Sequence, residues 1–265
     1  MTKHKIPHEH PRAESLRTRE RLIENYDHGI VATSGLMAHG RGEAFDYLLG
    51  EKTTEPALTA SESAAAMLLT ATNPVISVNG NAAALVAEDI VKLANLTEAK
   101  VEVNLFYRTI RRERAIEKLL KKAGMRDVLG VGEQASARIP ELNSQRRRVD
   151  PRGILVADVV LVPLEDGDRT EALIRMGKKV IAIDLNPLSR TAQQATITIV
   201  DNVVRAMPKL VEAVERLKKR DSRECQNILL NFDNRRNLAD SIILIKENLA
   251  NMAAKSNIVS QKEKG

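Results

Sequence analysis

The chain has 265 residues, of which 43% are hydrophobic and only 2% aromatic, with no tryptophan; this excludes a disordered chain and favours an aliphatic core, as in a parallel β-sheet covered by helices. The net charge of +6 is spread along the sequence and therefore favours small polyanions such as nucleotides over nucleic acid or a membrane surface. The single cysteine, Cys225, excludes an internal disulfide and a zinc motif and indicates a reducing, cytoplasmic compartment.

The first ten residues read as an extended arm without an apolar signal region, and no segment of the chain approaches the 18 apolar residues of a membrane helix. A helical pattern then runs from Pro11 to about Tyr26, with Leu16 and Ile23 on one apolar face. Arg19 lies in the middle of this face. It is either an arginine at the edge of the apolar stripe or paired inside the core, or the ligand of an anion.

Gly40-Arg41-Gly42 directly precedes a predicted helix from Glu43 to Leu49, which Gly50 ends. Glycines beside a helix start allow backbone N–H groups to approach an anion. The alternative is an ordinary turn into the helix. An alanine-rich helix from about Pro56 to Thr72 is predicted next.

Residues 74–106 read as strand, turn, helix and strand, which predicts a βαβ unit with parallel strands. The turn, Asn79-Gly80-Asn81, is not a G-x-G-x-x-G fingerprint, but it can expose N–H groups at the start of the helix. The next helix, Arg108 to Ala123, carries four arginines that we expect to be mostly solvated. They are Arg108, Arg111, Arg112 and Arg114.

Further strands are predicted at 127–131, 158–163, 180–183 and 196–200. Residues 138–153 form a polar loop between the first two of these strands, and its length favours a functional loop or lid. Within it, Arg146-Arg147-Arg148 either contacts RNA or a phosphorylated substrate, or is a solvated charge run. No aromatic residue lies near this cluster in the sequence.

The C-terminal part is predicted to be helical. Pro208 is expected in the first turn of one helix, and Asn237 is expected to cap a final helix whose apolar face includes Ile242, Ile245 and Leu249. Such a face must cover the sheet or pair with another subunit. We predict a single α/β domain over residues 1–265, with an N-terminal arm and helix (1–30), a Rossmann-like core of mostly parallel strands (74–204) and C-terminal helices (205–255).

Acidic and amide side chains follow two neighbouring predicted strands. Asp184 and Asn186 follow 180–183, and Asp201 and Asn202 follow 196–200. Ligands of open α/β sheets bind at the carboxyl ends of the strands, where an acid can accept hydrogen bonds from ribose hydroxyls. Arg190, with its planar guanidinium, and the hydroxyls of Ser189 and Thr191 suit phosphate. The alternative is turn chemistry with a surface arginine.

Other chemistries find little support in the sequence. It contains no Walker A motif and no G-x-S-x-G nucleophile motif. Two histidines, His8 and His10, have metal-ligand spacing but lie in the N-terminal arm. The five histidines are His4, His8, His10, His28 and His39.

Several long stretches resemble the archaeal-type phosphopantothenate synthetase family, 4-phosphopantoate–β-alanine ligases. The resemblance covers nearly the whole chain. It implies a Rossmann-like homodimer that uses ATP and Mg²⁺ to join 4-phosphopantoate to β-alanine in coenzyme A biosynthesis, releasing AMP and diphosphate. The stretches are "IPHEHPRAESLRTRERL", "GLMAHGRGEAFDYLLGE", "DLNPLSRTAQQATITIVDN" and "NFDNRRNL".

The resemblance also implies which residues contact ATP. They are Arg19, Arg41, Asp184, Leu185, Asn186, Arg190, Thr191, Asp201 and Asn202. With Mg²⁺, Arg19, Arg41 and Arg190 are expected to balance phosphate charge during catalysis. No metal ligand is predicted.

The 4-phosphate of the substrate needs an anion site of its own. We expect it at Asn79-Gly80-Asn81, with Arg111 or Arg147 as rival positions. Two other functions stay open: a different nucleotide-dependent ligase or kinase on the same fold, and an RNA-binding protein that uses Arg146 to Arg148.

Overall fold

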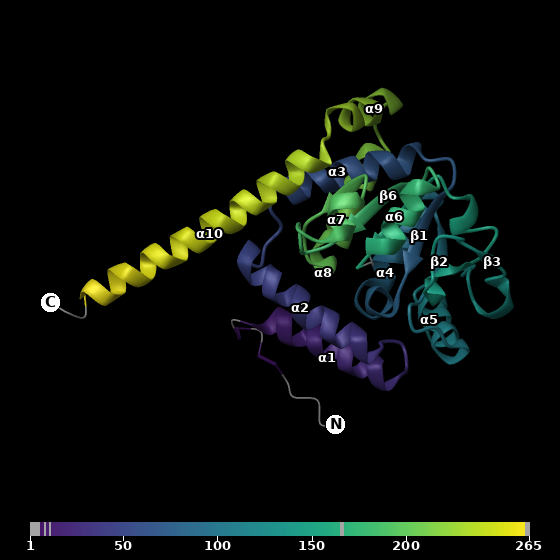
Figure 1. Cartoon of the computed structure of the whole chain (residues 1–265), viewed down its shortest axis with the longest axis horizontal. Coiled ribbons are helices and arrows are strands. Elements are labelled where there is room, and N and C mark those ends of the chain that lie inside the picture. The colour runs from purple at the N-terminus through teal and green to yellow at the C-terminus, as the bar shows by residue number, and fades with distance from the viewer. Residues whose placement is uncertain (1–5, 8, 11, 165–166, 263–265) are drawn as a thin grey trace.

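A computed structural model describes residues 6–7, 9–10, 12–164 and 167–262, and side-chain exposure up to residue 255. Most of the predicted N-terminal arm, including His4 and His8, therefore lies outside the described residues. A five-stranded sheet flanked by helices forms the body of the molecule, a pair of helices (α1 and α2) lies beside it, and one long helix (α10) projects away from it (Figure 1). No helix among the described residues is long and apolar enough to cross a membrane.

The five strands of the main sheet pair only in parallel, in the order β2-β1-β5-β6-β7. This confirms the predicted α/β fold and the βαβ unit. The chain moves from β1 to one side and then returns to the other, so the direction of winding changes between β1 and β5. The strands are β1 (Pro74–Val78), β2 (Lys100–Val103), β5 (Val159–Pro163), β6 (Lys179–Ile183) and β7 (Ile197–Ile199).

Helices precede, connect and follow the strands. Those before and within the sheet region are α1 (Ala13–Asp27), α2 (Thr33–Leu49), α3 (Glu55–Thr70), α4 (Gly80–Thr97), α5 (Ile110–Lys122), α6 (Gly167–Arg175) and α7 (Arg190–Gln194). Those after it are α8 (Val203–Leu217), α9 (Ser222–Asn231) and α10 (Asn234–Lys262). Three short 3-10 helices are η1 (Gly132–Gln134), η2 (Gln145–Arg147) and η3 (Ile154–Val156).

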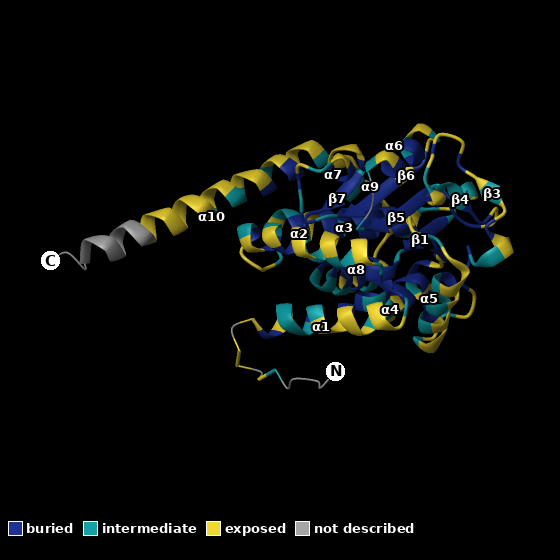
Figure 2. Ribbon diagram, turned by 60° about the horizontal axis from the view of Figure 1, so that its bottom comes forward, coloured by how far each residue is buried: buried dark blue, intermediate teal, exposed yellow. Residues whose placement is uncertain are grey.

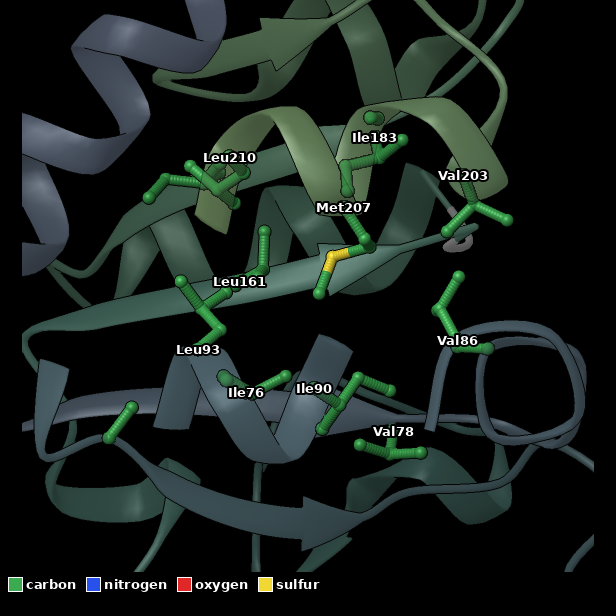
Figure 3. Packing of buried hydrophobic residues seen from close by; sticks show 14 of the residues in the cluster. Ile76, Val78, Val86, Ile90, Leu93, Leu161, Ile183, Val203, Met207 and Leu210 are labelled. Atoms are coloured by element: carbon green, nitrogen blue, oxygen red, sulfur yellow. The ribbon is translucent and has the colours of Figure 1, made fainter. Parts of the chain in front are cut away.

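Alternate side chains of the strands face opposite layers of the core. On one face, Ile76 and Leu161 pack among residues of α3, α4 and α8, including Leu93, Met207 and Leu210 (Figure 3). The other face is covered by α6 and the segment 137–157. Each large aliphatic side chain removed from water in this way contributes about 1.5–3 kcal/mol, and Figure 2 shows the strands as the most buried part of the molecule.

Two expectations for the first half of the chain are wrong. Helix α2 begins at Thr33, so Gly40-Arg41-Gly42 lies inside a 17-residue helix and not before a short one. Tertiary contacts outweigh the low helix propensity of its glycines, which costs about 1 kcal/mol each. The strand predicted at 127–131 is reduced to a single bridge between Leu129 and Glu102, and the chain leaves the sheet at Gly130, where φ is +79°.

Two helix starts in the C-terminal part also differ. Helix α8 begins at Val203 after the cap Asn202, so Pro208 lies inside it and not in its first turn. Helix α10 begins at Asn234, and Asp233 caps it by accepting a hydrogen bond from Arg235 N at 2.8 Å. Asn237, the expected cap, is buried one turn further on and donates to Thr198 O at 2.8 Å.

The segment 137–154 is ordered by buried polar contacts. A short hairpin joins β3 (Ala137–Arg138) to β4 (Arg148–Val149). Asn104 donates from Nδ2 to Arg146 O at 3.1 Å and to Arg148 O at 3.2 Å. The carboxylate of Glu102, which is fully buried, accepts from Asp150 N at 2.9 Å and Ile154 N at 2.6 Å. Burial raises the pKa of Glu102 from 4.5 to about 7.

The expectation that the arginines of 108–123 are mostly solvated holds for two of the four. Arg111 and Arg114 are exposed, whereas the side chain of Arg108 is 3% exposed and pairs with Glu113 at 2.5 Å. Arg112 is half-buried. Arg108 and Arg112 therefore belong to the interior of the molecule, close to the carboxyl edge of the sheet.

Candidate functional site

A cavity of about 330 Å³ lies over the carboxyl ends of the parallel strands. Its lining includes Asn79, Leu164, Leu185 and Asn202, which follow β1, β5, β6 and β7 within three residues. Helix α2 forms a second wall. The cavity therefore spans the point between β1 and β5 where the winding changes direction, which is where open α/β sheets bind ligands.

At one end of the cavity is the start of α4, and its asparagines are structural. Asn79 accepts from Ala82 N at 3.0 Å and donates to Pro163 O and Leu164 O at 2.8 and 2.9 Å, which joins the ends of β1 and β5. Asn81 donates to Gly35 O of α2 at 2.8 Å. The backbone N–H groups of Gly80 and Asn81, in contrast, have no hydrogen-bond acceptor among the described residues.

Two of the glycines permit this close approach. A Cβ on Gly80 would lie 2.3 Å from Ile30 O, and a Cβ on Gly35 would lie 2.2 Å from Asn81 Oδ1. Any larger residue would separate α4 from α2 or from the segment before it. These glycines therefore fix the end of the cavity.

Two arginines, Arg112 and Arg146, line the same end of the cavity as the start of α4. Arg112 donates to Ile30 O at 2.9 Å, and Arg146, which is 6% exposed, donates to Asn104 O at 3.0 Å. Burial lowers the pKa of Arg112, and repulsion from Arg146 lowers it further. The positive charge here suits an anion.

The centre of the cavity is lined by successive turns of α2. Gly35 contacts the start of α4, and a Cβ on Gly42 would lie 3.5 Å from Leu185 at the end of β6. His39 and Arg41 lie between these two contacts and also line the cavity. Helix α2 thus bridges the end of β1 and the end of β6.

One turn further along α2, Glu43 joins α2 to α1. It accepts from Arg19 at 2.5 to 3.2 Å and from Ser15. Burial raises the pKa of Glu43, but the hydrogen bonds and charge of Arg19 outweigh this, and the net pKa is below its ordinary value. Arg19 therefore contacts Glu43, which lines the cavity, but Arg19 itself does not line the cavity.

The segment after β6 forms a hydrogen-bonded turn. Asp184 accepts from Asn186 N at 2.9 Å and from Ser189 Oγ at 2.5 Å, and Ser189 caps α7 by accepting from Ala192 N. Burial raises the pKa of Asp184, while Ser189, Asn186 and the charge of Arg41 lower it. Arg41 of α2 is therefore within electrostatic reach of the strand-end acid, although the two lie far apart in the sequence.

The segment after β7 is held by an ionic network. Asp201, 1% exposed, accepts from Thr53 at 2.7 Å and from Arg205 at 2.7 and 2.9 Å. Arg205 also pairs with Asp46 of α2 at 2.5 Å. Asn202 donates to the same Asp46 at 2.8 Å. The network fixes α2 against the end of β7.

The structure brings together some of the residues expected to form the site. Six of them line the cavity: Arg41, Asn79, Gly80, Asn81, Leu185 and Asn202. Arg190, whose side chain is 69% exposed, pairs with Glu171 at 3.0 Å outside the cavity. Four more of the expected residues do not line it: the buried Thr191 and Asp201, and Asp184 and Asn186 of the turn after β6.

Sequence reasoning missed several cavity residues: His39, Glu43, Phe106, Tyr107 and Arg112. His39 and Glu43 are four residues apart, a spacing that places two residues on one face of a helix. The prediction missed them because it began the helix only after Gly40-Arg41-Gly42. Phe106 and Tyr107 also line the cavity with Arg146, so aromatic rings do lie near that cluster in space.

No group of three or more His, Cys, Asp or Glu that could hold a metal ion is found within the described parts of the chain. Carboxylates at the cavity are instead paired with arginine or engaged in turns. A divalent ion here would take most of its oxygen ligands from a bound nucleotide and water, as Mg²⁺ often does.

Comparison with known proteins agrees on one family. The profile of the phosphopantothenate/pantothenate synthetase family matches residues 56–248. The 4-phosphopantoate–β-alanine ligase of Methanosarcina mazei is 51% identical over 251 residues, covering 95% of this chain and 98% of the relative. The ligase of the same name from Thermococcus kodakarensis is 52% identical over 249 residues, covering 94% and 95%.

Proposed function

We propose, from the premise that the chain belongs to the phosphopantothenate/pantothenate synthetase family, that it is an ATP-dependent ligase joining (R)-4-phosphopantoate to β-alanine. The observation that carries the proposal is the 51% identity to a ligase of this name across 95% of the chain. The cavity is lined by residues of α2, of the sheet edge and of α8, so we also propose that the 265 residues form a single ligase domain. We further propose that the protein is located in the cytoplasm.

The reaction requires activation of a carboxylate, because its oxygen is a poor leaving group. The pantoate carboxylate attacks the α-phosphorus of ATP, and diphosphate leaves. The nitrogen of β-alanine then attacks the acyl carbon of the adenylate, and AMP leaves. The product is 4'-phosphopantothenate, a precursor of coenzyme A. Holding both substrates in line within one cavity supplies much of the rate.

The nucleotide is placed at the β6 and β7 end of the cavity. Asp184 and Asn186 are proposed to contact the ribose there, and Arg41 is proposed to contact phosphate. Its electrostatic reach to Asp184 supports this. Further proposed contacts are Arg19, Leu185, Arg190, Thr191, Asp201 and Asn202. Mg²⁺ bound with ATP would offset phosphate charge.

The 4-phosphate is placed at the other end of the cavity. A helix start with two N–H groups lacking recorded acceptors attracts an anion, and Arg112 and Arg146 repel each other at the same place. A phosphate between them would relieve this repulsion. Arg112 and Arg146 thus replace the rival positions Arg111 and Arg147 in the proposed site: neither rival lines this cavity, and Arg111 lies at a neighbouring surface hollow.

The phosphate site can be tested by comparing two substrates. Arg112→Ala should raise KM for 4-phosphopantoate by about 10- to 100-fold, because a hydrogen bond to a charged group is worth roughly 1.5–3 kcal/mol. The rate with pantoate, which lacks the phosphate, should change far less. Arg111→Ala is the matched control. Equal losses with both substrates would refute the assignment.

The activity itself is tested by product identity. Purified protein, ATP, Mg²⁺, 4-phosphopantoate and β-alanine are incubated, and mass spectrometry identifies the nucleotide product. AMP, diphosphate and 4'-phosphopantothenate are expected, and their release over many turnovers should depend on both 4-phosphopantoate and β-alanine. ADP as product would instead identify a ligase or kinase of different mechanism.

The RNA-binding alternative required Arg146 to Arg148 to form an exposed basic surface. Arg146 is buried and bonded to Asn104 O, and Arg148 is half-buried, with its guanidinium at 3.4 Å from Ala135 O and Gly132 O. The cluster is therefore not a free basic surface. Binding of RNA in the absence of ATP turnover would restore this alternative.

We propose a homodimer, with α10 as part of the interface. The first half of the helix contacts α2 and α3, as far as the hydrogen bond from Asn248 to Leu48 O, and the second half leaves the body (Figures 1 and 2). Ile242, Ile245, Leu249 and Met252 follow the three- and four-residue spacing of a coiled-coil seam, although Ile245 packs against the chain's own core. Leu249 and Met252 are 48% and 63% exposed, so a second copy of the same helix is the proposed partner.

A further inference from the structure

His39 is the histidine of the cavity, and the proposed reaction leaves it without a role. The adenylate step needs positive charge, which Arg41 and its neighbours provide. The amide step has a different requirement: β-alanine carries an ammonium group, which resembles that of lysine with a pKa of about 10.4. One proton must leave this nitrogen before its lone pair can attack carbon.

The position of His39 along α2 is between the proposed 4-phosphate end and the proposed nucleotide end of the cavity. Gly35, at the contact with the start of α4, lies four residues before it, and Gly42, at the contact with Leu185, lies three residues after it. At 1.5 Å per residue, His39 is about 6 Å along the axis from the first contact and about 4.5 Å from the second. The carboxyl of the substrate must lie between its 4-phosphate and the nucleotide, which is this same stretch.

The surroundings of His39 favour the neutral ring. Burial lowers its pKa, the charge of Arg19 lowers it too, and the carboxylates of Glu43 and Asp46 offset this in part. Its Nε2 is buried and has no hydrogen-bond partner among the described residues. A neutral imidazole with spare hydrogen-bonding capacity at neutral pH can accept a proton.

We propose that His39 is the general base of the amide-forming step. Its imidazole accepts a proton from the ammonium group of β-alanine, and the freed lone pair forms the bond from nitrogen to the acyl carbon. The bond from that carbon to the AMP oxygen breaks, and AMP leaves with the electron pair. The second proton on the nitrogen is lost to water as the amide forms. This inference rests on the proposed ligase function.

The test separates the two half-reactions in His39→Gln, with His28→Gln, which is exposed at the end of α1, as the matched control. Exchange of labelled diphosphate into ATP reports adenylate formation. Hydroxylamine, which is mostly uncharged at neutral pH, replaces β-alanine and traps the adenylate as a hydroxamate without needing a base to remove a proton first. Melting temperatures confirm that both variants fold.

We expect His39→Gln to lose 100-fold or more in amide formation with β-alanine, the range of general base catalysis, and to keep diphosphate exchange and hydroxamate formation within about threefold of wild type. The deficit with β-alanine should shrink as pH rises from 7 to 9, because free amine then forms in solution. Equal losses with both nucleophiles, or no loss with either, would overturn the role of His39. Wild-type protein that exchanges no diphosphate and releases ADP would instead remove the proposed function, and the role with it.

Discussion

Replacing Glu102 with glutamine tests how the segment that carries Arg146 is anchored. Glu102 is fully buried, and its carboxylate holds the backbone of Asp150 and Ile154. Its pKa rises from 4.5 to about 7, so the folded state keeps a proton that the unfolded state loses. Its contribution to stability is therefore complete below pH 4.5 and is lost as pH rises to 7 and above.

The magnitude follows from the difference between the two pKa values. Each pKa unit corresponds to about 1.4 kcal/mol, so the full effect is about 3 kcal/mol, most of which falls between pH 5 and pH 8. Glutamine does not titrate. Its amide places one N–H against a backbone N–H, which costs stability by an amount that does not depend on pH.

The assay is urea unfolding of wild type and Glu102→Gln at several pH values from 5 to 8. The difference in unfolding free energy between the two proteins should move by roughly 2 to 3 kcal/mol in favour of the variant as pH rises, because only wild type must bury a charge. Glu141→Gln, exposed in the same segment, should show no such change. A difference that stays constant across this range would refute a buried carboxyl that titrates near pH 7.

Three further outcomes are expected. Arg41→Ala should reduce ligase turnover steeply while leaving the melting temperature within a few degrees, because Arg41 is exposed on α2; Arg235→Ala, an exposed arginine on α10, is the control, and wild-type turnover of the Arg41 variant would exclude a phosphate contact. Asp184→Asn should raise KM for ATP about tenfold, equivalent to about 1.4 kcal/mol, with a smaller change in kcat; loss of kcat at constant KM would place Asp184 at the reacting phosphate. Leu249→Asp should shift sedimentation to a 29.3 kDa monomer, and a wild-type protein that is already monomeric at micromolar concentration would contradict the dimer.

The layered core was predictable because the sheet is buried on both faces. Strands β5 and β6 contain uninterrupted aliphatic runs, and β1 is interrupted only by the buried Ser77. Polar residues, Asn79 and Asp184, directly follow β1 and β6. The sequence pattern was enough to predict the sheet, because strands of a parallel sheet that is buried on both faces consist of continuous aliphatic residues. The polar strand ends therefore led directly to the edge where the cavity lies.

Local pattern failed where a distant contact outweighs propensity. Helix α2 runs through Gly40 and Gly42 because the start of α4 and the end of β6 support it from outside. Arg112 resembles Arg111 in the sequence, yet only one of the two lines the cavity. Which arginine of a basic helix turns inward depends on the helix that packs against it, and no single sequence contains that information.

Helix α2 also fixes the distance between the two ends of the cavity. Its two contacts, at Gly35 and at Gly42, are seven residues and thus about 10 Å apart along a single rigid helix. The start of α4, proposed for the 4-phosphate, and the end of β6, proposed for the nucleotide, are therefore held apart by one helix, whereas separate loops would adapt to molecules of different length. Inserting one residue between Gly35 and Gly42 would turn the two contacts by about 100° relative to each other. In the proposed function, the number of residues in one helix therefore sets the spacing available to a phosphorylated acid with a four-carbon chain.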